Sequence, residues 1–188
     1  MKTKPLVIAI AAVSGGGKTT ITKMLQDKLL NAEFLYFDDC DYDAESGIDD
    51  ICEWAEAGAD LSLWNLQPLA DQINALLSKK QRPIDFIVMD YPFAYKQQQI
   101  AKFIDYAIFI DTPLDIALAR RILRDFSQET SDKICADINQ YLARGRKLYL
   151  GMLNTTKPDS DLVIDGSLPI DVIVDIIIKK LAELKGSR

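Results

Sequence analysis

The chain has 188 residues, a formal net charge of −6 and three cysteines, and it contains no histidine. That length fits one domain with a sizeable core. Without histidine, a His-based triad and a His-ligated metal are excluded, so a general base must be a carboxylate or another group. The negative charge argues against a nucleic-acid-binding protein, because neutralising phosphates requires a basic face. The odd, widely spaced cysteines predict neither a disulfide framework nor a zinc site.

The first predicted element is a buried strand at residues 6–13, an apolar run rich in β-branched side chains. Its eight residues are too few to cross a membrane, and no small-residue cleavage pattern follows them. We therefore expect a cytoplasmic protein without a membrane partner. A glycine cluster comes next, and then residues 19–30 place apolar side chains at helical spacing.

The rest of the chain alternates between short apolar strands and helices. Further strands are expected at 34–37, 84–89, 106–110 and 162–164. Further helices are expected at 48–57, 66–77, 113–126, 131–153 and 169–184. This alternation is typical of a parallel sheet with helices on both faces. We predict an α/β fold of five parallel strands that forms a single domain over residues 1–188.

Carboxylates follow four of the predicted strands. Asp90, Asp111 and Asp165 end three of them, and Asp38 follows the second strand. In open parallel sheets, ligands bind beyond the carboxyl ends of the strands. We therefore expect a polar site at that edge of the sheet.

The glycine cluster carries the strongest functional signal. Residues 12–19 read AVSGGGKT and match the P-loop pattern GxxxxGK[ST], except that Ala12 replaces the first glycine. In such a loop, backbone N–H groups converge on phosphate oxygens, which requires φ values that glycine adopts cheaply. The N-terminus of the following helix adds positive potential. The predicted nucleotide-binding residues are Ser14, Gly15, Gly16, Gly17, Lys18, Thr19 and Thr20.

Three residues have individual predicted roles toward ATP and Mg²⁺. Lys18 can reach the β- and γ-phosphates, and Thr19 can place its hydroxyl on the metal. Asp90 supplies a carboxylate for Mg²⁺ or its water shell, with a turn residue before Pro92 as the alternative. We expect Ala12 to add slight strain or to alter the reach of the loop without removing the site.

The class of P-loop protein follows from what the sequence lacks. A GTPase needs the motifs DxxG and NKxD, and neither occurs in the chain. Motor ATPases usually bring more length and accessory domains. A small-molecule kinase is therefore the favoured hypothesis, and a slowly hydrolysing regulatory ATPase is the alternative.

Four parts of the chain carry a family resemblance. They are residues 14–20, 37–42, 108–125 and 161–166. Together they resemble the uridine kinase and nicotinamide riboside kinase group of P-loop kinases over nearly the whole length. The chain departs from that group at residues 40–42 and 90–92, both near the expected acceptor. The resemblance implies ATP-dependent phosphorylation of a small-molecule hydroxyl, with an acceptor-binding segment at about 38–80 and a lid at about 118–147.

The resemblance also implies a general base. Asp38 is the predicted residue that orients or deprotonates the acceptor hydroxyl, because phosphoryl transfer depends on positioning. Asp39 is the alternative base if the match to the family is shifted by one residue. The second alternative is that Asp38 is only a turn residue at the strand end.

Arginines on the expected lid helix are the remaining catalytic candidates. Arg120 and Arg124 share one helix face and could stabilise the transferring phosphoryl group. The alternative for them is surface ion pairing with Asp115 or Asp125. Arg121, between them, is more readily a surface residue.

Two further sets of residues have a structural interpretation. Arg144, Arg146 and Lys147 form a basic cluster that is expected on a solvated helix face. Trp54 and Trp64 lie within the acceptor-binding segment, where they either form an aromatic wall or, more commonly, pack in the core.

The charge of the acceptor-binding segment bears on the substrate. From Leu29 to Ser78 there are twelve acidic residues and no lysine or arginine. The segment is either a solvated acidic face or a pocket for a neutral or cationic acceptor, such as a nucleoside, a sugar, a ribosylated pyridinium or an amino alcohol. A phosphorylated acceptor of the adenylate or dephospho-coenzyme A type is the alternative, but it would require basic residues there.

Overall fold

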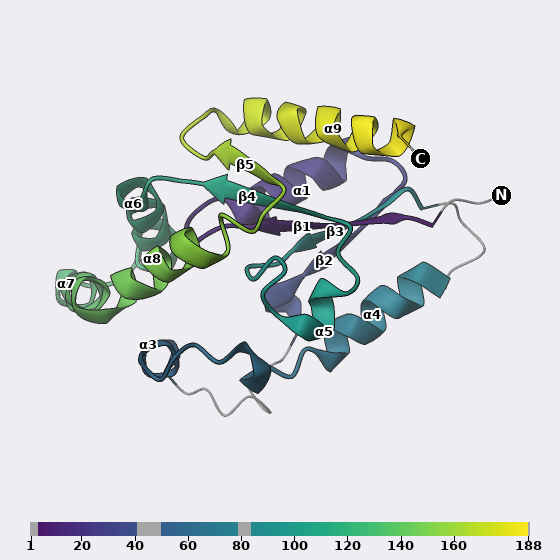
Figure 1. Cartoon of the computed structure of the whole chain (residues 1–188). Coiled ribbons are helices and arrows are strands. Elements are labelled where there is room, and N and C mark those ends of the chain that lie inside the picture. The colour runs from purple at the N-terminus through teal and green to yellow at the C-terminus, as the bar shows by residue number, and fades with distance from the viewer. Residues whose placement is uncertain (1–3, 41–49, 79–83, 188) are drawn as a thin grey trace.

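The computed structural model of the protein describes residues 4–40, 50–78 and 84–187. In these residues five parallel strands form one sheet in the order β2-β3-β1-β4-β5 (Figure 1). The strands are β1 (Leu6–Ala11), β2 (Ala32–Tyr36), β3 (Phe86–Asp90), β4 (Tyr106–Asp111) and β5 (Leu162–Asp165). The predicted α/β fold with a five-stranded parallel sheet is therefore confirmed.

Apart from the short helix α5, which was not predicted, the helices lie close to their predicted positions. They are α1 (Lys18–Lys28), α3 (Ile51–Glu56), α4 (Gln67–Ser78), α5 (Gln98–Ala101), α6 (Leu114–Asp125), α7 (Ser131–Gln140), α8 (Arg146–Thr155) and α9 (Ile170–Gly186). Short 3₁₀ turns occupy η1 (Phe37–Asp39) and η2 (Leu61–Leu63). Residues 48 and 49 of the expected helix 48–57, and Asp41 and Tyr42 of the family-like stretch, lie outside the described residues.

One predicted helix, 131–153, is divided. A π-helical turn, η3 (Tyr141–Gly145), joins α7 to α8. The cap of α7 is Thr130, whose backbone is extended and whose side chain accepts a hydrogen bond from the Lys133 N–H. Ser131 is the first residue of the helix, as the expected range 131–153 predicted.

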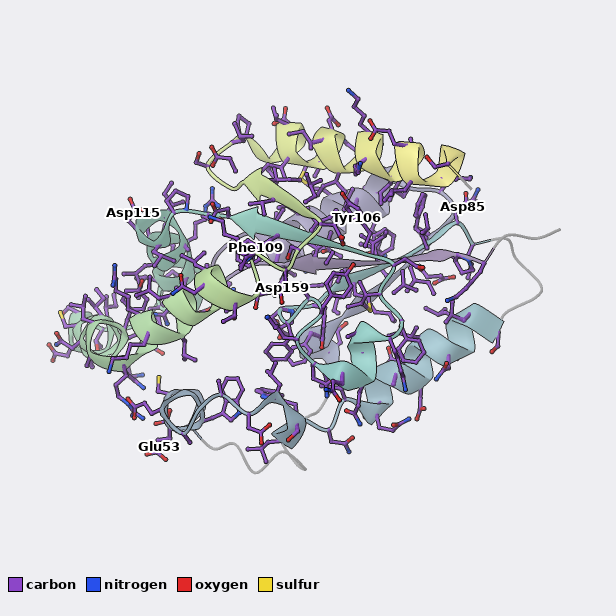
Figure 2. All side chains as sticks on the ribbon, in the orientation of Figure 1. Glu53, Asp85, Tyr106, Phe109, Asp115 and Asp159 are labelled. Atoms are coloured by element: carbon purple, nitrogen blue, oxygen red, sulfur yellow. The ribbon has the colours of Figure 1, made fainter. Side chains whose placement is uncertain are left out.

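Strand β1 lies at the centre of the sheet and faces both layers of helices. Leu6, Ile8 and Ile10 pack in a buried cluster with side chains of α1 and α9. The alternating residues Val7 and Ala9 pack in a second cluster with α4, α5 and Phe109 of β4, which Figure 2 shows within the sheet. The helices α1 and α9 thus cover one face of the sheet and α4 and α5 the other (Figure 1).

Helices α6, α7 and α8 gather at the carboxyl ends of the strands, and α3 lies at the same end of the molecule (Figure 1). Helix α6 begins directly after Pro113, which precedes its first turn. Among the described residues, no helix combines the length and the apolar character that spanning a bilayer requires.

The central position of β1 generates a stability prediction. Ile8 is fully buried between β1 and the α1–α9 layer, so Ile8→Ala should lower the free energy of unfolding by about 2–5 kcal/mol. The same substitution at Ile176, an exposed isoleucine of α9, should change it by less than about 0.5 kcal/mol. Urea unfolding of both variants measures the difference, and equal losses would contradict the packing described here.

Candidate active site

The loop between β1 and α1 adopts a conformation that requires glycine at two positions. Gly15 and Gly17 have φ values of 77° and 94°, in the left-handed region. A Cβ added to Gly15 would also lie 2.0 Å from the carbonyl oxygen of Ala117 in α6. The glycines therefore allow the loop both to turn and to approach the lid helix closely.

Ala12 fits the start of this loop without strain. Its φ is negative, since the only described non-glycine residues with positive φ are Ala59 and Ala94. Its side chain is buried, and a Cβ on Gly16 would come within 2.8 Å of the Ala12 methyl. The expected strain at Ala12 is therefore wrong: the methyl group fills core space that Gly16 leaves open.

A buried hydroxyl that sequence reasoning missed holds the loop from behind. Thr112, directly after β4, donates a hydrogen bond of 2.9 Å to the carbonyl oxygen of Gly16. Gly166 packs against the same side chain, and a Cβ there would lie 1.9 Å from Thr112 Oγ1. The only sequence signal was the position of Thr112 at a strand end.

Asp90 at the end of β3 contacts both chemically active residues at the start of α1. Its Oδ2 accepts a hydrogen bond of 2.6 Å from Thr19 Oγ1, and its Oδ1 lies 2.7 Å from Lys18 Nζ. The second contact is a close ion pair. Its geometry is not that of a hydrogen bond, and Oδ1 accepts no hydrogen bond from the described residues. Asp90 is 2% exposed, so its charge depends on these two partners.

These oxygen atoms fit the magnesium ion of a nucleotide complex. A hydroxyl and a carboxylate are the hard oxygen ligands that Mg²⁺ prefers. No group of three or more His, Cys, Asp or Glu side chains able to hold a metal occurs in the described part of the chain. A magnesium ion at Thr19 and Asp90 would therefore complete its shell with phosphate oxygens and water, as P-loop sites do.

The loop opens into a cleft of about 1700 Å³. Asp38, in η1, lines this cleft together with the P-loop residues, whereas Asp39 is not among the described residues that line it. Arg120 and Arg124 of α6 line it as well. The structure thus brings the predicted catalytic side chains to one cavity.

The arginines of α6 differ in their partners. Arg124 donates to both carboxylate oxygens of Asp125, at 2.6 and 2.9 Å, and its Nη2 also lies 3.4 Å from Ser14 Oγ. Its pKa is raised first by the Asp125 hydrogen bonds and, in smaller part, by the charge of Asp38. Arg120 reaches the carbonyl oxygen of Gly166 at 3.5 Å. Both residues therefore stand beside the P-loop, and Arg124 also forms the ion pair with Asp125 considered as its alternative.

Arg121 has a structural partner in the next helix. Its guanidinium forms a bidentate ion pair with Asp137 of α7, and both side chains are mostly buried. Hydrogen bonding to Asp137 raises the pKa of Arg121, and the ion pair joins α6 to α7.

Tyr149 of α8 is a second residue that the sequence did not indicate. It lines the cleft, shares a hydrogen bond with Ser14, and burial raises the pKa of its hydroxyl. Its ring packs edge-on against Tyr141 at 5.3 Å between centroids. The expected lid is thereby in contact with the P-loop.

Aromatic side chains form one wall of the cleft. Phe37, Trp54, Trp64 and Phe93 all line it, with centroid separations of 5.5–6.0 Å between neighbouring rings. The same rings belong to or pack against the core beneath α4. The two interpretations of the tryptophans, aromatic wall and core packing, therefore hold together.

Two of the cations that line the cleft come from distant parts of the chain. Lys96 lines it and is paired with Asp159, on the loop before β5 (Figure 2). Arg144 lines it from η3 and forms ion pairs with Asp50 and Glu56. Arg144 keeps part of the solvent exposure that was expected for it, at 30%, and the π turn also places it against Asp50 and Glu56.

Two of the strand-end carboxylates do not reach the site. Asp111 forms an ion pair of 2.5 Å with Lys157, and Asp165 accepts hydrogen bonds from the backbone and hydroxyl of Ser167. Neither is among the described residues lining the cleft. Of the three aspartates that end strands, only Asp90 contacts the P-loop.

Comparisons with known proteins bear on the class to which the chain belongs. The sequence profile of the phosphoribulokinase/uridine kinase family matches residues 68–172, more than half of the chain. A uridine kinase of Bacillus pumilus (strain SAFR-032) is 26% identical, and the alignment covers 100% of this chain and 99% of that relative.

Solved structures share the fold at low sequence identity. A possible uridine kinase from Bacillus stearothermophilus has a TM-score of 0.55 and 19% identity, covering 88% of this chain and 91% of its own. A gluconokinase from Sinorhizobium meliloti 1021 has a TM-score of 0.55 and 16% identity, covering 98% and 95% respectively.

The fold, the P-loop and the family profile together define a P-loop kinase. The profile match begins after residue 67, so it is independent of the P-loop motif itself. The chain belongs to the phosphoribulokinase/uridine kinase family.

The Thr112 contact generates a second prediction. Thr112→Val keeps the shape of the side chain but leaves the buried Gly16 carbonyl without its donor, which should cost about 1–3 kcal/mol of stability. The affinity for nucleotide should fall as well, because the loop loses its support from β4. Thermal unfolding and nucleotide titration measure both effects.

Thr155→Val is the matched control for stability. Thr155 donates in the same way to the carbonyl of Gly151, but at an exposed position where water can replace the hydroxyl. A stability loss at Thr155 equal to that at Thr112 would contradict the role assigned to burial.

Proposed function

We propose that the chain transfers the γ-phosphoryl group of Mg·ATP to a hydroxyl of a small neutral or cationic metabolite, with a nucleoside as the first candidate. The observation that carries this proposal is the shared cleft. Lys18 and Thr19, which Asp90 contacts, line its P-loop end, and Asp38 and Arg124 line it too, with the charge of Asp38 contributing in small part to the raised pKa of Arg124. Membership of a kinase family supports the same reaction.

The donor side of the reaction is assigned to the P-loop. Its N–H groups and the N-terminus of α1 would bind the phosphates, and Lys18 would contact the β- and γ-phosphate oxygens. A bound magnesium ion would neutralise phosphate charge next to Thr19 and Asp90. Asp90 would hold both side chains in place before nucleotide arrives, which lowers the cost of ordering them.

The acceptor side is assigned to Asp38. The acceptor hydroxyl oxygen forms a bond to the γ-phosphorus while the bond from that phosphorus to the β,γ-bridging oxygen breaks. The hydroxyl proton passes to the Asp38 carboxylate, and ADP leaves with the electron pair of the broken bond. Asp38 therefore acts mainly by orienting the hydroxyl and receiving its proton.

Stabilisation of the negative charge on the transferring phosphoryl group is assigned to the arginines of α6. Arg120 and Arg124 line the same cleft as Asp38, and both lie near the P-loop, Arg124 at Ser14 and Arg120 at Gly17. Donors placed there in advance stabilise developing negative charge without reorganisation. The helices at 118–147 would act as the lid that excludes water, in keeping with the Tyr149–Ser14 contact.

The acceptor is proposed from the charge and the aromatic wall of its side of the cleft. Two of the cations that line the cleft, Lys96 and Arg144, are already paired with carboxylates. The aromatic wall offers a flat apolar surface to a ring. Uridine is the first acceptor to test, because it is named for the relatives with matching length. A cytoplasmic location stays a prediction.

The experiment that tests the proposal is ADP release from Mg·ATP with a panel of neutral, cationic and phosphorylated acceptors. We expect a neutral or cationic acceptor to stimulate release and Lys18→Ala to abolish the stimulation. Lys179→Ala, on the exposed side of α9, serves as the control and should retain it. Preference for a phosphorylated acceptor would overturn the acceptor proposal, whereas ATP binding without any stimulation would favour the regulatory ATPase.

The neighbouring aspartates of η1 provide a matched pair. Asp38→Asn should lower kcat by about 10²–10⁴, since the hydroxyl loses its proton acceptor. Asp39→Asn should retain kcat within about threefold, because Asp39 does not line the cleft. Steady-state kinetics with the stimulating acceptor measure both values, and the reverse pattern would transfer the role to Asp39.

A further inference from the structure

A three-residue charge cluster bridges the two sides of the acceptor half of the cleft. Arg144 Nε and Nη2 donate to the two carboxylate oxygens of Glu56 at 3.0 and 3.2 Å. Its Nη1 donates to Asp50 Oδ2 at 3.1 Å. The three residues, called the Arg144 clasp, thus connect η3 with the acceptor-binding segment at α3 (Figure 1).

The local structure on both sides positions the clasp. Arg144 lies on a π-helical turn inside an otherwise α-helical stretch, and such turns are rare and concentrate at functional sites. Asp50 accepts hydrogen bonds from the N–H groups of Cys52 and Glu53 at the start of α3. These bonds, and the charge of Arg144 in smaller part, hold the pKa of Asp50 below its ordinary value, so it is ionised at neutral pH.

The clasp neutralises Arg144, which lines the cleft from η3. Arg144 and Glu56 both line the cleft, whereas Asp50, the second partner of Arg144, is not among the described lining residues. Two carboxylates against one guanidinium leave the cluster with a negative charge. Uncommitted, the same guanidinium would be a strong bidentate partner for a carboxylate or phosphate group.

We propose that the Arg144 clasp determines the charge preference of the acceptor site: Glu56 and Asp50 occupy Arg144, so the site accepts neutral or cationic acceptors and rejects anionic ones. The inference rests on the proposed kinase function and names the residues behind its selectivity. Specificity of this kind comes from repulsion of the wrong ligand as much as from attraction of the right one. Removing both acidic charges reverses the sign of the cluster and should open the site to anionic acceptors.

The test compares nucleosides that differ in a ring carboxylate and keep the same hydroxyl groups. The probes are uridine, 5-carboxyuridine and orotidine, and the measured quantity is kcat/KM for ATP-dependent phosphorylation. Wild type should strongly prefer uridine. In Asp50→Asn/Glu56→Gln, the kcat/KM for at least one carboxylated nucleoside, relative to uridine, should rise about tenfold or more, because a freed guanidinium can pair with it.

Three companion variants make the result specific. Adding Arg144→Gln to the double variant should remove the gain, because the guanidinium that binds the carboxylate is then absent. Glu53→Gln, which removes an acidic charge from the exposed outer side of α3, should keep the wild-type ratio (Figure 2). Glu56→Gln alone retains the Asp50 cap of α3. It should raise kcat/KM for the carboxylated nucleoside relative to uridine, by less than the double variant does. This single variant tests the proposal if the double variant unfolds.

The outcomes separate the two proposals. Suppose that wild type phosphorylates uridine and that the acid-to-amide variants have the same kcat/KM for carboxylated nucleosides relative to uridine as wild type. The clasp then does not set the charge preference. A gain that persists without Arg144, or that Glu53→Gln reproduces, likewise overturns it in favour of a general effect of net charge. If wild type phosphorylates none of the neutral acceptors of the ADP-release panel, the proposed function itself fails, and the inference fails with it.

Discussion

The contact of Asp90 with Lys18 and Thr19 is the interaction on which the site depends. A carboxylate that is almost fully buried is tolerated only when its charge is met, and here an ammonium and a hydroxyl from the first turn of α1 meet it. Asp90 pairs in register with Ile10 of β1, so the contact fixes the start of α1 against the carboxyl ends of the two central strands.

The P-loop is supported by neighbours as well as by its own glycines. Thr112 holds the Gly16 carbonyl from β4, Gly166 leaves the space that Thr112 needs, and the Ala117 carbonyl of α6 leaves no room for a side chain at position 15. A loop held in this way has its N–H groups oriented in advance, which is where a phosphate-binding site gains its affinity. Helix α6 and the P-loop therefore pack directly against each other.

Much of the fold could be predicted from the spacing of apolar residues and from the residues that interrupt the apolar runs. All five strands lie within two residues of their expected ends, because buried parallel strands are uninterrupted apolar runs. The π turn at 141–145 and the short helix α5 were not predicted, since neither leaves a periodic signal. At the site, Asp90, Asp38 and the α6 arginines were found because they sit at strand ends or on one helix face, whereas Thr112 and Tyr149 gave no comparable signal.

By itself, the sequence determined the order of the elements, the phosphate loop and the kinase class, because these follow from local patterns and from residues adjacent in the chain. The tertiary structure alone decided which charges meet. It paired Arg144 with Glu56 and Lys96 with Asp159, placed Asp38 but not Asp39 on the cleft, and directed Asp111 and Asp165 away from it. Ion pairs between distant segments depend on where helices cross and where side chains point, and neither is encoded in spacing along the chain.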